Sequence, residues 1–135
     1  MVVPKLYEVT FLPLSETKKR KNVKCPWSLD KLYKKWVKGV EVIYFGCAGD
    51  RENLKTDRSL RKRLTDLINH ANGRTTERGP HKGGEIIWQL KGYETFEVGY
   101  LPTEEPPEPR NLEKWLNCTF KSLKGGRLPF GNRRI

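Results

Sequence analysis

The pattern of hydrophobic and polar residues predicts a central buried strand at Val40–Gly46, with the sequence Val-Glu-Val-Ile-Tyr-Phe-Gly. The run is short, rich in β-branched and aromatic residues and preceded by Gly39, which is typical of a strand covered on both faces. Tyr44 stands near its exit. Gly46 follows and leaves space for a close approach to the backbone.

Further segments also show strand patterns. Lys5–Phe11 alternates in side-chain character with the period of two that a strand requires, and Pro13 ends it. Glu85–Leu90 and Phe96–Leu101 flank Lys91-Gly92, which predicts a hairpin.

Amphipathic helices are expected between and after these strands. The first begins after Ser28, a good N-cap residue, and ends at Gly39. The second runs from about Arg58 to Asn72, and the last covers Leu112–Leu123 before Gly125-Gly126. This order of elements predicts an α/β fold, a small sheet with helices around it.

The charge of the chain narrows the choice of partner. Its 135 residues fit one domain, 1–135, and its 27 Lys and Arg against 16 Asp and Glu give a net charge of +11. Such an excess favours a polyanion as partner, with nucleic acid first, an anionic membrane surface second and a merely well-solvated basic protein third.

The remaining composition bears on location and metal binding. No apolar run is long enough for a membrane span and no signal-peptide core precedes Pro4, so we expect a cytoplasmic protein that does not bind a membrane. Cys25, Cys47 and Cys118 are too scattered for a disulfide framework or a zinc site, which indicates reduced thiols.

Basic side chains gather in a loop before the first helix, on the polar face of that helix, beside the apolar stripe of the second helix and in the C-terminal tail. Each position is also consistent with an ordinary solvated surface. As contacts to a nucleic-acid backbone we expect Lys18, Lys19, Arg20, Lys21, Lys31, Lys34, Lys35, Lys38, Arg61, Arg133 and Arg134.

The sequence lacks the motifs of several catalytic classes: it has no G-x-S-x-G, no Walker loop and no H-E-x-x-H. The residues that remain for chemistry are distributed over different elements. They are Tyr7, Tyr44, Arg63, His81, Glu113 and Asn132.

These residues fall in motifs that resemble those of the GIY-YIG nuclease family, in the same order and over nearly the whole chain. Lys5-Leu6-Tyr7 stands where the family has Gly-Ile-Tyr, and Tyr44-Phe45-Gly46 where it has Tyr-Ile-Gly. Leu60–Leu64 matches the helix segment that carries the arginine. Leu112–Leu116 resembles the glutamate helix, and Gly126–Asn132 the closing asparagine stretch.

The resemblance implies a small, mostly antiparallel central sheet flanked by helices, with a basic insertion at about 13–39. It also implies a divalent-metal-dependent endonuclease that hydrolyses phosphodiester bonds in DNA, with DNA favoured over RNA as the nucleic-acid partner. Glu113 would be the one protein ligand of Mg²⁺ or Mn²⁺, and Arg63 would hold the scissile phosphate. Tyr7 would orient the water or act as general base, with Tyr44 beside it.

His81 and Asn132 complete the implied set, Asn132 as a residue that orients a neighbour or contacts the substrate. A free tyrosine has a pKa of about 10, so a base role for Tyr7 needs nearby positive charge. The family's leading Gly-Ile is replaced here by Lys5-Leu6, and Leu67 stands where the family often carries a histidine or tyrosine.

Each residue also has a purely structural explanation. Strand tyrosines pack, Glu113 in a first helical turn favours the helix dipole, and the stem of Arg63 covers apolar surface. Two other functions therefore stay open: a catalytically degenerate module of the same fold that binds nucleic acid, and a basic interaction protein without a nucleic-acid partner. The sequence leaves the oligomeric state open.

Overall fold

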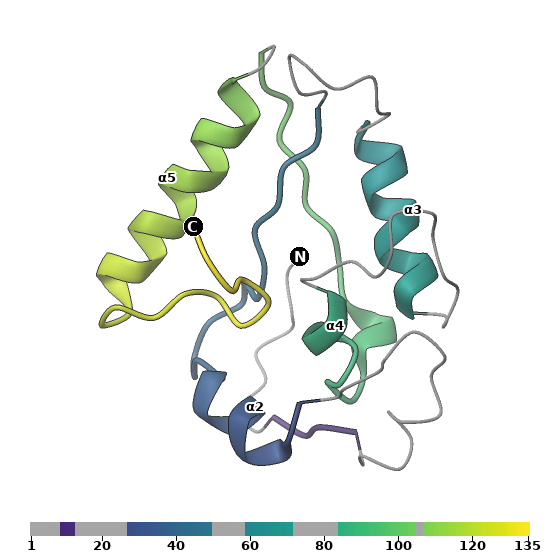
Figure 1. The fold of residues 1–135 in the computed structure, drawn as a ribbon, viewed down its shortest axis with the longest axis vertical. Coiled ribbons are helices and arrows are strands. Elements are labelled where there is room, and N and C mark those ends of the chain that lie inside the picture. The colour runs from purple at the N-terminus through teal and green to yellow at the C-terminus, as the bar shows by residue number, and fades with distance from the viewer. Residues whose placement is uncertain (1–8, 13–26, 50–58, 72–83, 105–106) are drawn as a thin grey trace.

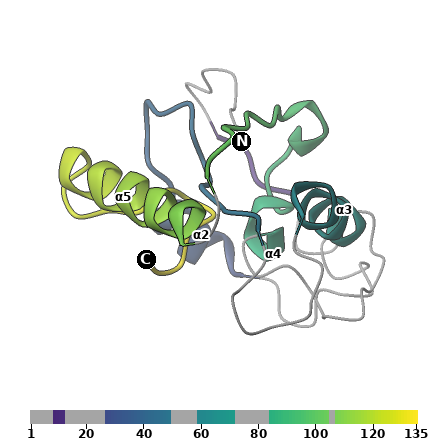
Figure 2. The same ribbon diagram turned by 90° about the horizontal axis from the view of Figure 1, so that it is seen from above.

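The computed structural model describes residues 9–12, 27–49, 59–71, 84–104 and 107–135. Helices α3 and α5 lie on opposite sides of the molecule, with α2 at one end (Figure 1), and the view from above keeps α3 and α5 apart (Figure 2). The helical elements are α2 (Leu29–Lys35), α3 (Leu60–Ala71), α4 (Gly84–Ile87), the 3₁₀ turn η1 (Tyr93–Thr95) and α5 (Glu108–Leu123).

None of the described residues forms a β-strand, so the predicted α/β fold with a mostly antiparallel central sheet is wrong. The described part is helical, with elongated segments between the helices (Figure 1). Of the predicted strand Lys5–Phe11, the described end makes an isolated antiparallel bridge between Phe11 and Leu90. Its hydrogen bonds join Leu12 N to Gln89 O at 2.7 Å and Lys91 N to Thr10 O at 2.9 Å.

The predicted central strand Val40–Gly46 runs through the middle of the molecule without strand pairing among the described residues (Figure 1). Its partners come from the C-terminal segment instead. Gly131 N donates to Ile43 O at 2.7 Å, and the Asn132 side chain bonds to the Phe45 backbone. These contacts satisfy Ile43 O and both backbone groups of Phe45, and Val42 takes part in an isolated bridge.

The hairpin predicted at 85–101 is also wrong. Its first half is α4 followed by turns, with Gln89 N bonded to Ile86 O and Leu90 N to Ile87 O, both at 3.1 Å. Ile86 through Leu90 are all buried. A continuous apolar run of this kind fits a buried helical turn as well as a strand, and periodicity does not separate the two.

The first predicted helix is confirmed as α2, but it ends at Lys35 instead of Gly39. Its start is as expected, because the Ser28 hydroxyl accepts a hydrogen bond from Lys31 N at 3.4 Å. At its end, the Arg127 guanidinium donates to the backbone oxygens of Lys34 and Trp36. An arginine from the far end of the chain thus satisfies carbonyls that a helix end leaves unpaired.

The second predicted helix is confirmed as α3, with Ser59 at its start accepting from Lys62 N through its hydroxyl at 3.2 Å. Its buried face differs from the apolar stripe that the sequence predicts for this helix. Leu60 and Ile68 are exposed, whereas Asp66, Leu67, His70 and Ala71 are buried. The face that turns inward is therefore partly polar.

The last predicted helix is confirmed as α5 and begins earlier than expected, at Glu108. It stops where the glycines predicted, with Gly125 and Gly126 at φ 61° and 85°. Gly126 N bonds to Lys121 O at 2.8 Å, which satisfies a carbonyl of the last turn.

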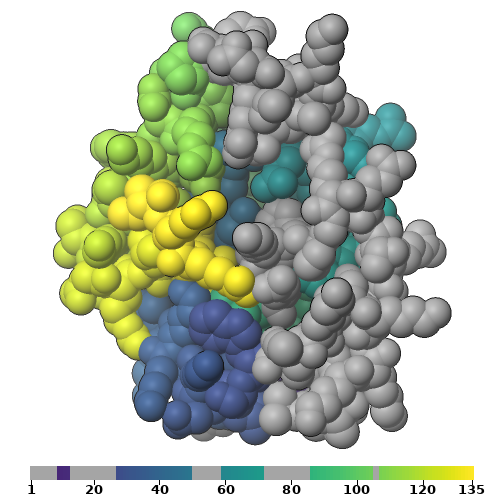
Figure 3. Space-filling model, viewed as in Figure 1, coloured from purple at the N-terminus to yellow at the C-terminus, as the bar shows by residue number. Residues whose placement is uncertain are grey.

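One buried cluster draws on every described range of the chain. Phe130 of the C-terminal segment stacks on Phe11 with ring centroids 5.8 Å apart and meets Trp36 edge-on at 5.4 Å. Figure 3 shows this segment, in yellow, lying against α5 and the blue α2 region. The core residues are Phe11, Leu32, Trp36, Ile43, Leu67, Ala71, Ile86, Ile87, Trp88, Leu90 and Phe130. Among the described helices, none has the length and apolar character to cross a membrane.

Candidate functional site

Tyr44 lies at the centre of the candidate site, half-buried between two glycines. A Cβ at Gly46 would lie 2.7 Å from Tyr44 Cε1 and 2.8 Å from its hydroxyl oxygen, so the ring folds back over that glycine. A Cβ at Gly131 would lie 3.1 Å from Tyr44 Cβ. The close approach that the sequence predicted at Gly46 is therefore made by the Tyr44 ring.

Arg63 reaches Tyr44 from α3. The helix begins at Leu60, and Arg63 N bonds to Ser59 O at 3.0 Å, which places Arg63 in the first turn. Its half-buried guanidinium donates a hydrogen bond to the Tyr44 hydroxyl oxygen. The planar fork of an arginine carries five N–H donors, so contact with one phenol leaves donors for a phosphate.

Glu113, on α5, acts on the same phenol through its charge. Its side chain is half-buried, and its negative charge adds to the rise that burial causes in the pKa of Tyr44. The backbone oxygen of Glu113 accepts from the buried Asn117 side chain at 3.1 Å. Two residues from distant parts of the sequence thus influence one hydroxyl, Arg63 by a hydrogen bond and by charge, and Glu113 by charge.

The balance of influences keeps the Tyr44 hydroxyl protonated. Burial raises the pKa of Tyr44 most, the Arg63 charge opposes the rise, and Glu113 and Cys47 add to it. The hydrogen bond from Arg63 also lowers the pKa, but the net direction is upward. At neutral pH Tyr44 is therefore a neutral phenol that donates and accepts hydrogen bonds, and not a general base.

Asn132 does not face the Tyr44 hydroxyl but holds the backbone beside it. Its Oδ1 accepts from Phe45 N and its Nδ2 donates to Phe45 O, both at 2.9 Å. The residue is 5% exposed. Of the two roles predicted for Asn132, this geometry fits the one that orients a neighbour.

Two predicted site residues, Tyr7 and His81, lie outside the described residues, as do the loop cations Lys18, Lys19, Arg20 and Lys21. His70 of α3 is 1% exposed, so it is buried in the core.

The metal-binding side chains of the described residues fit one kind of magnesium site. In the ranges that the structure describes, no group of three or more His, Cys, Asp or Glu residues gathers to hold a metal. Glu113 supplies a single carboxylate beside Arg63 and Tyr44. Mg²⁺ is commonly bound through one or two carboxylates, with waters and substrate phosphates as its other ligands. Glu113 thus fits a substrate-completed site and not a closed cage.

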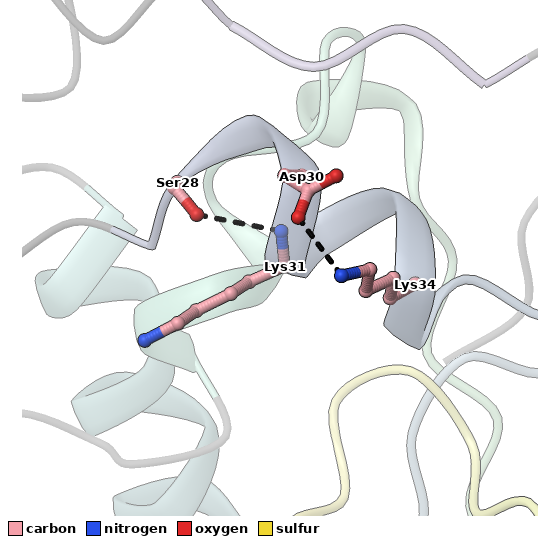
Figure 4. Close-up of polar contacts among 4 residues, drawn as sticks. All are labelled: Ser28, Asp30, Lys31 and Lys34. Carbon is pink, nitrogen blue, oxygen red and sulfur yellow. Dashed lines mark hydrogen bonds and ion pairs between the residues drawn. The ribbon is translucent and has the colours of Figure 1, made fainter.

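The four lysines of α2 and its end are not equivalent. Lys34 pairs with Asp30 at 3.1 Å, with both side chains more than three-quarters exposed, and Lys31 extends away from that pair (Figure 4). Lys38 is exposed. Lys35 turns inward, and its ammonium donates to the backbone oxygen of Asn132 at 2.6 Å. The predicted uniform lysine face is therefore divided between solvent and interior.

The predicted arginine contacts Arg61, Arg133 and Arg134 are all exposed. Arg133 in addition lies over the Trp27 ring, 5.4 Å from its centroid. Arg127 was not singled out by the sequence, although it anchors the C-terminal segment to the end of α2. No local pattern marks an arginine whose partners are carbonyls about ninety residues away.

No protein-family model, curated protein or solved structure matches this chain. The resemblance to GIY-YIG nucleases thus depends on the sequence motifs alone. Chemically, the arrangement offers a guanidinium for a phosphate, a neutral phenol for an oxygen and a carboxylate for a cation.

Proposed function

We propose that this chain is a divalent-metal-dependent endonuclease that hydrolyses phosphodiester bonds in DNA. The observation that carries the proposal is the hydrogen bond from Arg63 to the Tyr44 hydroxyl, on which the charge of Glu113 also acts. These residues belong to three motifs that resemble those of GIY-YIG nucleases, and the net charge of +11 supports a polyanionic substrate.

Each residue has a different role in phosphodiester hydrolysis. Arg63 binds the non-bridging oxygens of the scissile phosphate and offsets the charge that develops there. The neutral Tyr44 hydroxyl donates to a phosphate oxygen while Arg63 fixes its position. Water supplies the oxygen that bonds to phosphorus, the bond from phosphorus to one ester oxygen breaks, and that oxygen takes up a proton.

Glu113 is the residue that would hold Mg²⁺ or Mn²⁺, with waters and substrate oxygens as further ligands. The ion would neutralise charge on the phosphate and lower the pKa of a bound water. Asn132 keeps Tyr44 in place by holding the backbone of Phe45.

The test is nicking of a supercoiled plasmid with Mg²⁺, with Mn²⁺ and with a chelator. Arg63→Ala and Glu113→Ala should each lower the rate by about 100-fold, the scale of losing one charge-stabilising group. Arg110→Ala and Glu108→Ala are matched controls, because both residues are exposed on α5. If Arg63→Ala and Glu113→Ala nick as fast as the parent, the assignment of the site is wrong.

The second candidate is a module that binds nucleic acid without cutting it. The raised pKa of Tyr44 favours it, because a buried neutral phenol cannot activate water as a base. This candidate predicts tight DNA binding at low salt and intact plasmid with every divalent metal. Metal-dependent nicking that Arg63→Ala abolishes would exclude it.

A further inference from the structure

A cluster of three cations lies where the C-terminal segment contacts α2. It consists of Lys35, Arg127 and Arg133, which we call the basic cluster. Lys35 is the last residue of α2, and its ammonium donates to Asn132 O at 2.6 Å. Arg127 is fixed by carbonyls of Lys34 and Trp36, and Arg133 lies over Trp27. Backbone contacts and a ring thus hold the cations in defined positions.

These cations act on one another. After burial, the charges of Arg133 and Arg127 are the influences that lower the pKa of Lys35. Neither Lys35 nor Arg127 takes part in the ion pairs that join Lys34 to Asp30 and Lys62 to Asp66. A half-buried ammonium between two guanidinium groups is costly for the folded protein, and a bound anion would offset that repulsion.

The donors of the basic cluster suit a phosphate. The Lys35 ammonium has three N–H donors and gives one to Asn132 O. An arginine fork matches the oxygens of a phosphate, and charge-assisted bonds of this kind are the strongest that a side chain offers. Carbonyls and a tryptophan ring hold the arginines, so little side-chain entropy is lost on binding.

The basic cluster is connected to the candidate site through Asn132. The backbone oxygen of Asn132 accepts from Lys35, while its side chain holds both backbone groups of Phe45, the residue after Tyr44. An anion bound by Lys35 would therefore contact a side chain that is bonded to the residue that positions the Tyr44 segment.

We propose that Lys35, Arg127 and Arg133 bind one backbone phosphate of the nucleic acid at a point separate from the phosphate that Arg63 holds. The identity of the ligand as DNA rests on the proposed function, whereas the phosphate site stands on the cluster itself. Two fixed phosphates would set where the strand lies relative to Tyr44.

Inorganic phosphate is the first probe. The thermal midpoint Tm of the full chain is followed as phosphate replaces chloride at constant ionic strength. A saturable rise in Tm is expected, with a Kd about tenfold weaker in Arg133→Gln and in Lys35→Gln, as for loss of roughly 1.4 kcal/mol of binding. Lys114→Gln, an exposed lysine on α5, is the control and should keep the parental Kd.

A short DNA duplex is the second probe. Arg133→Gln should weaken duplex binding about tenfold, and phosphate should compete with DNA in the parent more than in the variant. If the parent never cuts DNA but these results hold, the proposed nuclease fails and the phosphate site stands.

Two results would overturn the proposal. Equal phosphate responses in Arg133→Gln, Lys35→Gln and Lys114→Gln would show that the cluster is no site. The Tm rise with phosphate could also depend on Arg133 while duplex binding is unchanged in Arg133→Gln. That result would assign the site to a free phosphorylated molecule and would exclude nucleic acid as its ligand.

Discussion

At the scale of single residues, the Tyr44 hydroxyl is where burial and charge oppose each other. The phenol is held against Gly46, and Tyr44 Cβ lies against Gly131; neither glycine has a side chain to displace the tyrosine. Arg63 alone favours the ionised form, whereas burial, Glu113 and Cys47 disfavour it. The chemistry that the structure supports for Tyr44 is therefore hydrogen bonding by a neutral phenol.

The titration of Tyr44 is a direct prediction of this environment. Because its folded-state pKa is raised above that of the unfolded chain, the stabilisation is complete below about pH 10 and is lost as pH rises through the folded pKa. Tyrosinate absorbance should show a late-titrating phenol that Tyr44→Phe removes. Arg63→Gln should shift that phenol to still higher pH, since it removes both influences that lower the pKa. A late phenol that persists in Tyr44→Phe would contradict the prediction.

At the scale of elements, side-chain amides do part of the work expected of neighbouring strands. Asn132 bonds to both backbone groups of Phe45. Gln89 does the same for Trp27, accepting from its N–H at 3.0 Å and donating to its oxygen at 2.9 Å. Each amide offers a donor and an acceptor side by side, as a peptide group does. Elongated segments are thereby fixed without a ladder of strands.

Asn132→Asp tests this role with little change in shape. The carboxylate still accepts from Phe45 N but faces Phe45 O without a donor, so we expect a loss of about 1–3 kcal/mol in the free energy of unfolding at neutral pH. Urea denaturation measures it. Lowering the pH should restore part of the lost free energy of unfolding, because the protonated side chain at position 132 can again donate to Phe45 O. Asn111→Asp on exposed α5 surface is the control, and an equal loss there would refute the special role of Asn132.

At the scale of the whole molecule, the net charge of +11 governs long-range attraction. The cations differ in environment, however. Lys34 is paired with Asp30, Lys35 is half-buried, and Lys31 and Arg134 are exposed. Only the exposed and clustered cations are placed to touch a phosphate backbone.

Salt dependence should reveal how many of these cations contact DNA. The logarithm of the binding constant should fall linearly with the logarithm of salt concentration, with a slope of about −0.9 for each phosphate contacted. Arg134→Gln should make the slope less steep by about one contact. Fluorescence anisotropy with a labelled duplex measures both slopes, and binding that salt leaves unchanged would exclude a backbone-binding protein.

The sequence by itself determined that helices form at α2, α3 and α5, that α5 stops at its glycines and that the chain is basic. These features depend on neighbours along the chain: Ser28 and Ser59 cap the helices that follow them, and Gly125 and Gly126 take the positive φ that ends α5. The sequence motifs also singled out Tyr44 and Arg63, which are hydrogen-bonded to each other in the structure.

Only the tertiary structure decided what pairs with the apolar segments and which way polar side chains turn. The sequence favoured strands at 40–46 and 85–101, yet among the described residues the first makes an isolated bridge at Val42 and bonds to Gly131 and Asn132, and α4 formed at the second. Arg127 bonds to carbonyls at the end of α2, and Lys35 turns inward to Asn132. Each outcome depends on groups far apart in the chain meeting in space, which no local pattern of residues encodes.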